Sequence, residues 1–325
     1  MTNAPLTIEV TRGGRVESRH RVDAVICDGD GEVVAAWGDA QRPTQPRSAI
    51  KAIQAIPLIT SGAADEAGLT DVELALACSS HNGEAGHVAA VEAWLGALGH
   101  DGEVLECGAH VPYYRPAADA MLLAGESPNR MHNNCSGKHS GFVHTSIHLG
   151  DGPTGYLAPS HPQQVRVTRI SSRLTGADVS GQQPGVDGCG IPVWTFPLHG
   201  LARGWARLSS GSGLDADDAA AGNRLLDAMV RQPWYVAGTD RHCTTTMYAH
   251  GGRIAAKTGA EGVFCAVDRE TGRGVALKCD DGASRAAEHA LDWVLARLTK
   301  AEPPAPVVLK NWAGTEVGEI RVKQQ

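Results

Sequence analysis

A serine and a lysine three residues apart are the first residues in this chain that could do chemistry. They stand in Ser48-Ala49-Ile50-Lys51, where apolar residues recur with helical spacing. Residues i and i+3 of a helix share a face, so the lysine amine could activate the serine hydroxyl as a nucleophile. Lysine is a base at neutral pH only if burial or a nearby positive charge lowers its pKa from about 10.4. The alternative is that Ser48 only caps a helix.

Two further motifs follow in an order that favours the catalytic interpretation. Ser80-His81-Asn82 and Lys257-Thr258-Gly259 are typical of the S-x-N and K-T-G elements that follow S-x-x-K in penicillin-recognising serine acyltransferases. Lys257 could supply the positive charge that lowers the pKa of Lys51. Lys257 to Gly259 also ends a predicted strand, whose edge could hold a substrate while the glycine allows close approach. The alternatives are a solvent-facing Lys257 and an ordinary loop at Ser80.

A third group of residues could bind a metal ion. Residues 132–140 combine amides, a thiol, an amine and imidazoles, and Cys135 has a potential partner in Cys189. Two thiolates are a natural start for a zinc site. The chain has no C-x-x-C pair, and the spacing of the two cysteines matches no standard zinc module. Two buried thiols or a redox pair therefore remain alternatives.

The elements that must position these motifs are a sheet and a set of helices. Two β-rich runs at residues 20–27 and 32–37 flank the turn sequence Asp28-Gly29-Asp30-Gly31, which predicts a hairpin. Further strands are predicted at residues 252–257, 262–267 and 275–279, in a meander. The predicted helices are residues 48–56, 86–98, 161–174, 215–231 and 283–298.

Strands at both ends of the chain with helices between them predict an α+β fold. We expect one domain, residues 1–325. Its antiparallel sheet would come from about residues 6–40 and 250–280, with a helical region at about 48–245 and a C-terminal helix at about 283–299 covering the sheet.

Composition restricts the classes of ligand. The 325 residues are 42% hydrophobic and 20% charged with a formal net charge of -7, and no basic cluster favours nucleic acid or an anionic membrane. We therefore expect a small-molecule ligand, with no nucleic-acid or membrane partner. No signal peptide or transmembrane run is evident, which predicts a cytoplasmic protein. The eight cysteines are too sparse for a disulfide scaffold.

Taken together, the motifs resemble those of the rhizobial-type, or class 3, L-asparaginases. The segments that carry the resemblance are residues 46–51, 78–84, 134–139, 187–192, 257–262 and 311–318. The resemblance implies a fold like that of the serine β-lactamases, penicillin-binding proteins and glutaminases. It also implies a homodimer.

The same resemblance implies roles for individual residues. Two Ser-Lys pairs are expected, with the nucleophile Ser48 activated by Lys51 and with Ser80 beside Lys257. A zinc ion is expected at three ligands, while no organic cofactor is implied. The three ligands are Cys135, Cys189 and the neutral amine of Lys138.

These roles predict the hydrolysis of the side-chain amide of L-asparagine through an acyl-enzyme, with Lys51 shuttling the proton and backbone amides near Ser48 and Lys257 stabilising the oxyanion. For the zwitterionic end of the substrate we expect Arg47 to bind the carboxylate and Asp187 the ammonium group. Three other polar residues are expected nearby as substrate-binding groups: His81, Asn82 and His139.

Three alternatives to an asparaginase remain open. A glutaminase differs by one methylene in the substrate, which is worth only about 1–3 kcal/mol of discrimination. A β-lactamase-like serine hydrolase would use the same three motifs, although such enzymes act outside the cytoplasm. A metal-binding or redox module would use Cys135 and Cys189 without the serine chemistry.

Overall fold

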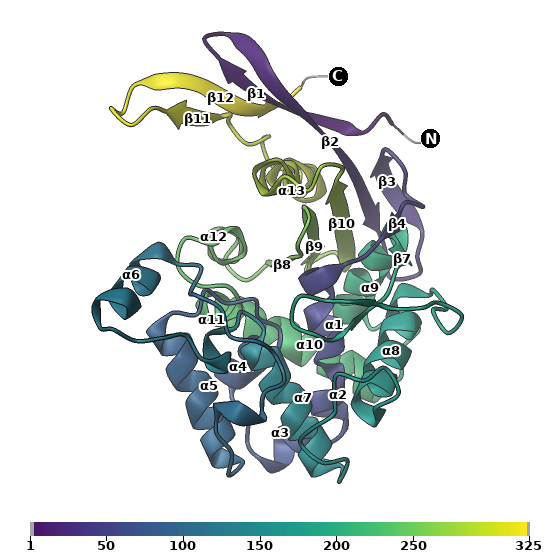
Figure 1. The fold of residues 1–325 in the computed structure, drawn as a ribbon. Helices are drawn as coiled ribbons and strands as arrows, with labels where there is room; N and C mark the ends of the chain where they lie inside the picture. Colours follow the sequence, from purple (N-terminus) through teal and green to yellow (C-terminus); the bar gives the residue numbers. More distant parts are fainter. Residues whose placement is uncertain (1–2, 324–325) are drawn as a thin grey trace.

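An antiparallel sheet joins the two ends of the chain in the computed structural model, which describes residues 3–323 (Figure 1). Its strand order is β11-β12-β1-β2-β10-β9-β8, and β3 also pairs with β2. The strands are β1 (Leu6–Arg12), β2 (Arg15–Cys27), β3 (Val33–Trp37), β8 (Ile254–Thr258), β9 (Val263–Asp268), β10 (Arg273–Cys279), β11 (Val307–Lys310) and β12 (Glu316–Val322). The predicted α+β class, with a sheet built from both ends of the chain, is confirmed.

The predicted hairpin around Asp28 is the β2–β3 pair. The Asp28 carboxylate accepts the N–H groups of Gly31 and Glu32, both at 3.0 Å, which closes the turn. The prediction missed the hairpin β11–β12, which pairs with β1 at the other end of the chain. Only Ile320 of β12 is fully buried, so the hydrophobic pattern of this strand is weak.

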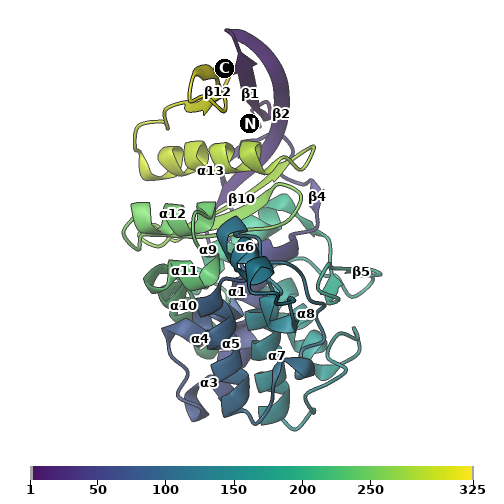
Figure 2. The same ribbon diagram turned by 60° about the vertical axis from the view of Figure 1, so that its left-hand side comes forward.

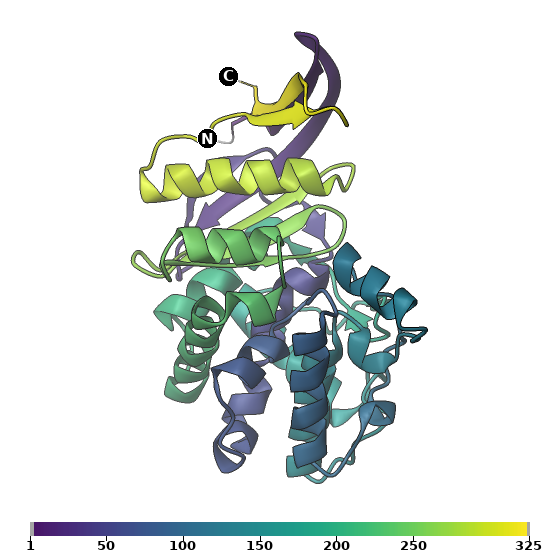
Figure 3. The same ribbon diagram turned by 90° about the vertical axis from the view of Figure 1, so that its left-hand side faces the viewer.

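Helices cover both faces of the sheet. Helix α13 (Ser284–Thr299) lies across one face, and α9 (Leu198–Ser210) packs against the other (Figures 1 and 2). A Cβ atom on Gly274 of β10 would lie 2.0 Å from the carbonyl oxygen of Ala202, so only glycine allows α9 to approach this closely. Strands β1 and β12 extend beyond α13 (Figure 3).

The middle of the chain is a body of helices below the sheet in Figure 1. Its helices are α1 (Lys51–Gln54), α2 (Ile56–Thr60), α3 (Ala63–Glu66), α4 (Asp71–Ala77), α5 (Ala85–Ala97), α6 (Arg115–Leu123), α7 (Ser136–His148), α8 (Pro162–Thr175), α10 (Ala216–Arg231), α11 (Pro233–Val236) and α12 (His242–Ala249). Two short strand pairs join parts of it: β4 (Pro43–Thr44) with β7 (Phe196–Pro197), and β5 (Gly185–Val186) with β6 (Pro192–Val193). No helix within residues 3–323 has the length and apolar character needed to cross a bilayer.

The helix predicted at residues 48–56 differs from the structure. A 3-10 turn, Arg47–Ile50, precedes α1, and α2 begins only at Ile56. Pro46 rather than Ser48 precedes the turn, and no side chain caps it. Ser48 is therefore not a helix cap, and the turn leaves its hydroxyl free. The other predicted helices are confirmed with boundaries shifted by a residue or two.

Candidate active site

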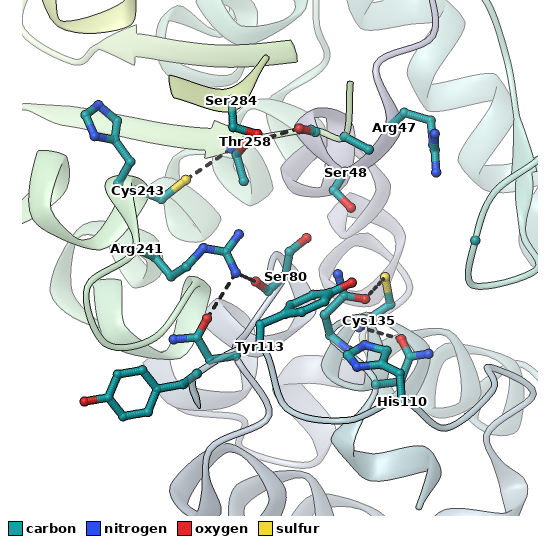
Figure 4. Close-up of a pocket in the computed structure, with 18 of the residues that line it drawn as sticks. Arg47, Ser48, Ser80, His110, Tyr113, Cys135, Arg241, Cys243, Thr258 and Ser284 are labelled. Atoms are coloured by element: carbon teal, nitrogen blue, oxygen red, sulfur yellow. Dashed lines mark hydrogen bonds between the residues drawn. The ribbon is translucent and has the colours of Figure 1, made fainter. Parts of the chain in front are cut away.

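A pocket of about 690 Å³ lies where the edge of the sheet meets the helical body (Figure 4). Its size is that of a small-molecule site. The predicted site residues that line it are Arg47, Ser48, Ser80, Asn82, Cys135, Asp187 and Cys189. The remaining predicted site residues are buried and are not part of the pocket lining: Lys51, His81, Lys138, His139 and Lys257.

Ser48 is held at the pocket by a strained turn. The preceding residue, Arg47, has a φ of 50°, a left-handed conformation that costs about 1–3 kcal/mol for a residue with a side chain. The end of β8 lies directly against this turn, because a Cβ atom on Gly259 would lie only 2.4 Å from the Pro46 carbonyl oxygen. The absence of a side chain at Gly259 thus lets β8 approach the turn that carries Ser48, whereas the approach of a substrate to this strand edge stays a prediction.

Ser80 lies between two buried lysines. Its Oγ accepts hydrogen bonds from Lys51 Nζ and from Lys257 Nζ, both at 2.9 Å. The backbone N–H of Ser80 donates to Val236 O at 2.9 Å, which fixes the loop after α4. One serine hydroxyl thus links amines from the first helical segment and from the sheet.

Burial lowers the pKa of Lys257 to about 7, and the positive charges of Lys51 and Arg241 act in the same direction. A large part of Lys257 is therefore neutral at neutral pH and can accept a proton from Ser80. A lysine with a lowered pKa was expected at this site. The sequence-based interpretation, however, had Lys257 supply the charge, whereas here Lys51 is one of the charges acting on Lys257.

Lys51 does not contact Ser48 as the i to i+3 spacing predicts. Its amine donates to Ser80 Oγ, to the Ser79 carbonyl and to Cys135 Sγ, the last at 3.0 Å. The break between the 3-10 turn and α1 removes the shared helical face, and the long lysine side chain reaches these buried acceptors instead. Within residues 3–323 the Ser48 hydroxyl makes no hydrogen bond, and it points into the pocket (Figure 4).

Cys135, Lys138 and Cys189 form a second cluster beside Ser80. Cys135 immediately precedes α7, Lys138 lies in its first turn, and Cys189 lies in the turn between β5 and β6. Lys138 Nζ donates to Cys189 Sγ at 3.0 Å. A hydrogen bond with Cys135 lowers the pKa of Cys189 to about 4 and correspondingly raises that of Cys135. The pair therefore favours a negative charge on Cys189, which contacts the amine of Lys138, while Cys135 contacts the amine of Lys51.

The sequence pattern of one family, L-asparaginase II, matches residues 8–322. The chain belongs to the L-asparaginase II family. This confirms the resemblance inferred from the motifs and makes the protein an amidohydrolase. A search of curated proteins finds no significant match.

Solved structures with a similar fold are distant from this L-asparaginase II family member. A protein called Mglu is 17% identical with a TM-score of 0.45, over 86% of this chain and 67% of that one. A β-lactamase from Mycobacterium bovis is 16% identical with a TM-score of 0.43, over 86% and 95%. An octameric penicillin-binding protein homologue from Pyrococcus abyssi is 12% identical with a TM-score of 0.36, over 87% and 74%.

The two sulfur atoms of Cys135 and Cys189 and the amine nitrogen of Lys138 are donor types that a metal ion such as zinc binds. Zinc binds sulfur at about 2.3 Å and nitrogen at about 2.0–2.1 Å, so two of its tetrahedral ligands lie roughly 3.5 Å apart. Lys138 Nζ and Cys189 Sγ, at 3.0 Å, need to separate only slightly. Burial opposes the charge of Lys138, but the two cysteines outweigh it and raise its pKa to about 12. Metal binding would therefore have to displace a proton from this amine.

The two residues expected to bind the ends of the substrate are paired with each other. Arg47 donates to both carboxylate oxygens of Asp187, at 3.1 and 3.3 Å. Burial alone would raise the pKa of Asp187, but Arg47 and Lys138 lower it. Both side chains line the pocket, and each would have to exchange its partner to bind a ligand.

The two histidines expected near the substrate lie behind the pocket wall. His81 contacts Ser136 Oγ at 2.8 Å, and His139 contacts the Tyr156 hydroxyl at 3.0 Å. Both histidines are 0% exposed, and burial lowers the pKa of each well below its usual range, so both are neutral. This placement argues against direct contact with a ligand and favours a supporting role in the wall.

Sequence reasoning missed several pocket residues. They include Arg241, at the start of α12, and also Tyr113, Thr239 and Cys243. None of them belongs to a motif, and each reaches the pocket through a loop or a helix end that is far along the chain from Ser48. No pattern in the sequence marks them.

A cluster away from the pocket also combines metal-binding residue types. His20, Cys279 and Asp281 present ligand atoms within 4.8 Å of one another. Arg285 donates to His20 Nε2 at 3.1 Å, so the ring proton lies on Nδ1 and points at Asp281, 2.6 Å away. The histidine nitrogen that faces the cluster is therefore a donor, which is the wrong state for a metal ligand.

Proposed function

We propose that the protein hydrolyses the side-chain amide of L-asparagine to L-aspartate and ammonia through an acyl-enzyme on Ser48. The observation that carries the proposal is Ser80 Oγ at 2.9 Å from the amines of both Lys51 and Lys257, in a pocket that Ser48 also lines. Membership of the L-asparaginase II family supports the choice of reaction.

Ser48 is the better nucleophile of the two serines because its hydroxyl is free. Ser80 is 3% exposed, and its oxygen lies between two amines, which leaves little room for an amide carbon. In the proposed reaction Ser48 Oγ attacks the side-chain carbonyl carbon and its proton passes to Ser80 and on to neutral Lys257. The C–N bond then breaks and ammonia leaves with the returned proton. Water opens the ester in the reverse sense and releases L-aspartate.

The developing oxyanion needs N–H donors. The N–H of Gly259 already donates to Val263 O at 2.7 Å, so this amide is engaged. The N–H groups of Ser48 and of Ala260, which both line the pocket, are the donors that we propose for the oxyanion.

We also propose that Cys135, Cys189 and neutral Lys138 hold a zinc ion. When bound, the ion would supply a fixed positive charge in place of the Lys138 proton. The three side chains lie next to the Ser80 cluster, since Cys135 contacts Lys51 at 3.0 Å. The ion would thereby keep Lys51 oriented toward Ser80. A homodimer is proposed from the family resemblance, and light scattering in solution measures the subunit number. The cytoplasmic location expected from the sequence stays a proposal.

Ammonia release from L-asparagine and L-glutamine, measured side by side, tests the proposed function. Wild-type protein should favour asparagine by about 10- to 200-fold in kcat/KM, the worth of one methylene. Ser48→Ala should lower kcat at least about 1,000-fold, and Ser80→Ala about 100-fold or more. Ser127→Ala, in an exposed loop, is the matched control.

The identity of the nucleophile is tested separately. An acid-quenched reaction should leave an aspartyl adduct on the peptide that contains Ser48. An adduct on the Ser80 peptide, or a Ser48→Ala variant as fast as the wild type, contradicts the mechanism. Faster turnover of a β-lactam than of asparagine would favour the β-lactamase-like alternative.

A further inference from the structure

Arg241 is a half-buried arginine of the pocket wall that makes no salt bridge in the described residues. Burial raises the pKa of the Glu288 carboxyl in the same lining, and the charge of Arg241 lies close enough to oppose that rise. Arg241 lies at the start of α12 and lines the pocket. Across residues 3–323 its guanidinium takes part in no ion pair with a carboxylate; its protein partners are the Asn82 side-chain oxygen at 3.1 Å and the Ser80 carbonyl at 3.5 Å. A cation that is partly removed from water and hydrogen-bonded only to neutral oxygens is well suited to receive an anion.

Asn82 holds Arg241 in place. The amide nitrogen of Asn82 donates to Glu84 Oε1 at 3.1 Å and to Thr239 O at 2.9 Å. These two acceptors fix the orientation of the amide, so its oxygen must face Arg241. Asn82 was expected to bind substrate itself, but both ends of its amide are engaged in this support.

Glu84 completes the support from behind. Its carboxylate accepts the backbone N–H of Thr239 at 2.8 Å and the Thr239 hydroxyl at 2.7 Å. The carboxylate therefore binds neutral donors and does not pair with Arg241. The guanidinium is held in one orientation while its charge stays available to the pocket, which is the arrangement of a preorganised anion site.

The other two arginines of the pocket are engaged. Arg47 donates to both oxygens of Asp187, and Arg115 pairs with Asp119 at 2.6 Å with its side chain 83% exposed. In Figure 4 the Arg241 guanidinium points toward Ser80, and Arg47 lies on the far side of Ser48. Of these three arginines, only Arg241 is both held in one orientation and without a carboxylate in hydrogen-bond contact.

We infer that Arg241 binds the carboxylate of the substrate, and that the pocket therefore selects amides that carry a carboxylate group. This inference rests on the proposed function and deepens it. It replaces Arg47 by Arg241 as the carboxylate-binding residue, and it makes Asn82 and Glu84 positioning residues. The planar guanidinium can donate two parallel N–H bonds to a carboxylate, which a lysine cannot.

Two substrates that differ in the carboxylate test the inference. L-Asparagine carries it, and 3-aminopropanamide is the same amide without it. In Arg241→Gln, kcat/KM for asparagine should fall by about 10- to 150-fold, the worth of a hydrogen bond between charged groups, mostly through KM. For 3-aminopropanamide the change should be less than about threefold. Arg241→Lys should lie between the wild type and Arg241→Gln.

The ratio between the two substrates separates binding from other effects. Arg241 also helps to lower the pKa of Lys257, but both amides use the same Lys257, so that effect cancels in the ratio. If turnover of 3-aminopropanamide is too slow, its inhibition constant against asparagine gives the same comparison. Arg115→Gln removes a cation at the rim of the pocket and is the matched control, with an expected change below about threefold.

Each failure has its own signature. If the wild type releases no ammonia from asparagine, the proposed function fails before Arg241 is tested. If the wild type is active but Arg241→Gln weakens both substrates equally, Arg241 acts on the reaction rather than on the carboxylate. If Arg47→Gln shows the selective loss instead, the carboxylate binds at Arg47. A thermal melt of each variant excludes unfolding as the cause.

Discussion

Two lysines that share one serine are the central feature of the site at the residue scale. Ser80 Oγ accepts from both amines at 2.9 Å, and burial lowers the pKa of Lys257 to about 7. Since like charges repel across a buried site, the charge of Lys51 helps to keep Lys257 neutral. The S-x-x-K motif therefore contributes Ser48 to the pocket and Lys51 to the neighbouring serine.

The pH dependence of kcat should report Lys257. Because its pKa is lowered to about 7, the amine is protonated below that pH and neutral above it. A reaction that needs the neutral amine should lose about tenfold in rate per pH unit below 7 and level off above. Lys257→Arg, which stays charged, should be inactive across the range. Lys310→Arg on exposed β11 is the control and should keep the wild-type profile. A wild-type pH profile in Lys257→Arg would contradict the role of Lys257.

Zinc content should depend on the cysteines of the second cluster. Cys189→Ser and Cys135→Ser each remove one of three proposed ligands and should lower the zinc-to-protein ratio at least about tenfold after dialysis against micromolar zinc. Elemental analysis by mass spectrometry measures the ratio. Cys107→Ser removes another buried thiol as the control. Equal zinc in all three variants would place the metal elsewhere.

At the scale of elements, the site depends on the contact between β8 and the turn that carries Ser48. The turn is strained at Arg47, and β8 lies against it through Gly259. Helix α7 and the β5–β6 turn bring the second cluster to the same place, because Cys135 and Cys189 both line the pocket. The proposed nucleophile and the proposed base thus come from elements that are distant along the chain.

Gly259→Ala should disturb this contact. The added methyl group would lie 2.4 Å from Pro46 O and 3.3 Å from Ala49 Cβ, and overpacking of this kind costs about 1–3 kcal/mol. Ammonia release should fall because β8 and the Ser48 turn separate, while urea unfolding should shift to lower denaturant. Gly96→Ala in α5, where no atom lies within 4 Å of the new Cβ, should leave both measurements unchanged or raise stability. If Gly259→Ala keeps wild-type kinetics, the contact between β8 and the Ser48 turn is not needed for activity.

At the scale of the whole molecule, one sheet joins the chain ends to the site. Strand β8 with Lys257 is one edge, and β11 is the other. The hairpin of β11 and β12 is attached through β1, with Ile320 paired to Val10 and 6% exposed. The far edge therefore contributes to stability without touching the pocket.

Ile320→Ala should lower the stability of the protein without changing its activity. Truncation of a buried isoleucine costs about 2–5 kcal/mol in unfolding free energy, which urea denaturation followed by circular dichroism measures. At 25 °C the folded protein should keep wild-type kcat and KM. Val308→Ala on β11, where the side chain is 49% exposed, should change stability by less than about 0.5 kcal/mol. A loss of activity in folded Ile320→Ala would mean that the far edge is coupled to the site.

Local patterns were sufficient for much of the fold. The β2–β3 hairpin follows from alternating apolar residues around an Asp-Gly turn, and α13 follows from its apolar face. Strand β12 was missed because Ile320 is its one fully buried residue, so its hydrophobic pattern is weak. The helix predicted from Ser48 was broken by a turn at Arg47, since periodicity does not detect a strained residue.

The amino-acid sequence by itself determined the family, the candidate reacting groups and most strands of the sheet, because motifs and periodicity are local properties. Only the tertiary structure decided that Lys51 and Lys257 share Ser80, that Arg47 pairs with Asp187, and that Arg241 is hydrogen-bonded to neutral oxygens. A lysine or arginine side chain is long and flexible enough to reach several different acceptors. Its partner is set by which distant segments pack around it, and spacing along the chain carries no information about that choice.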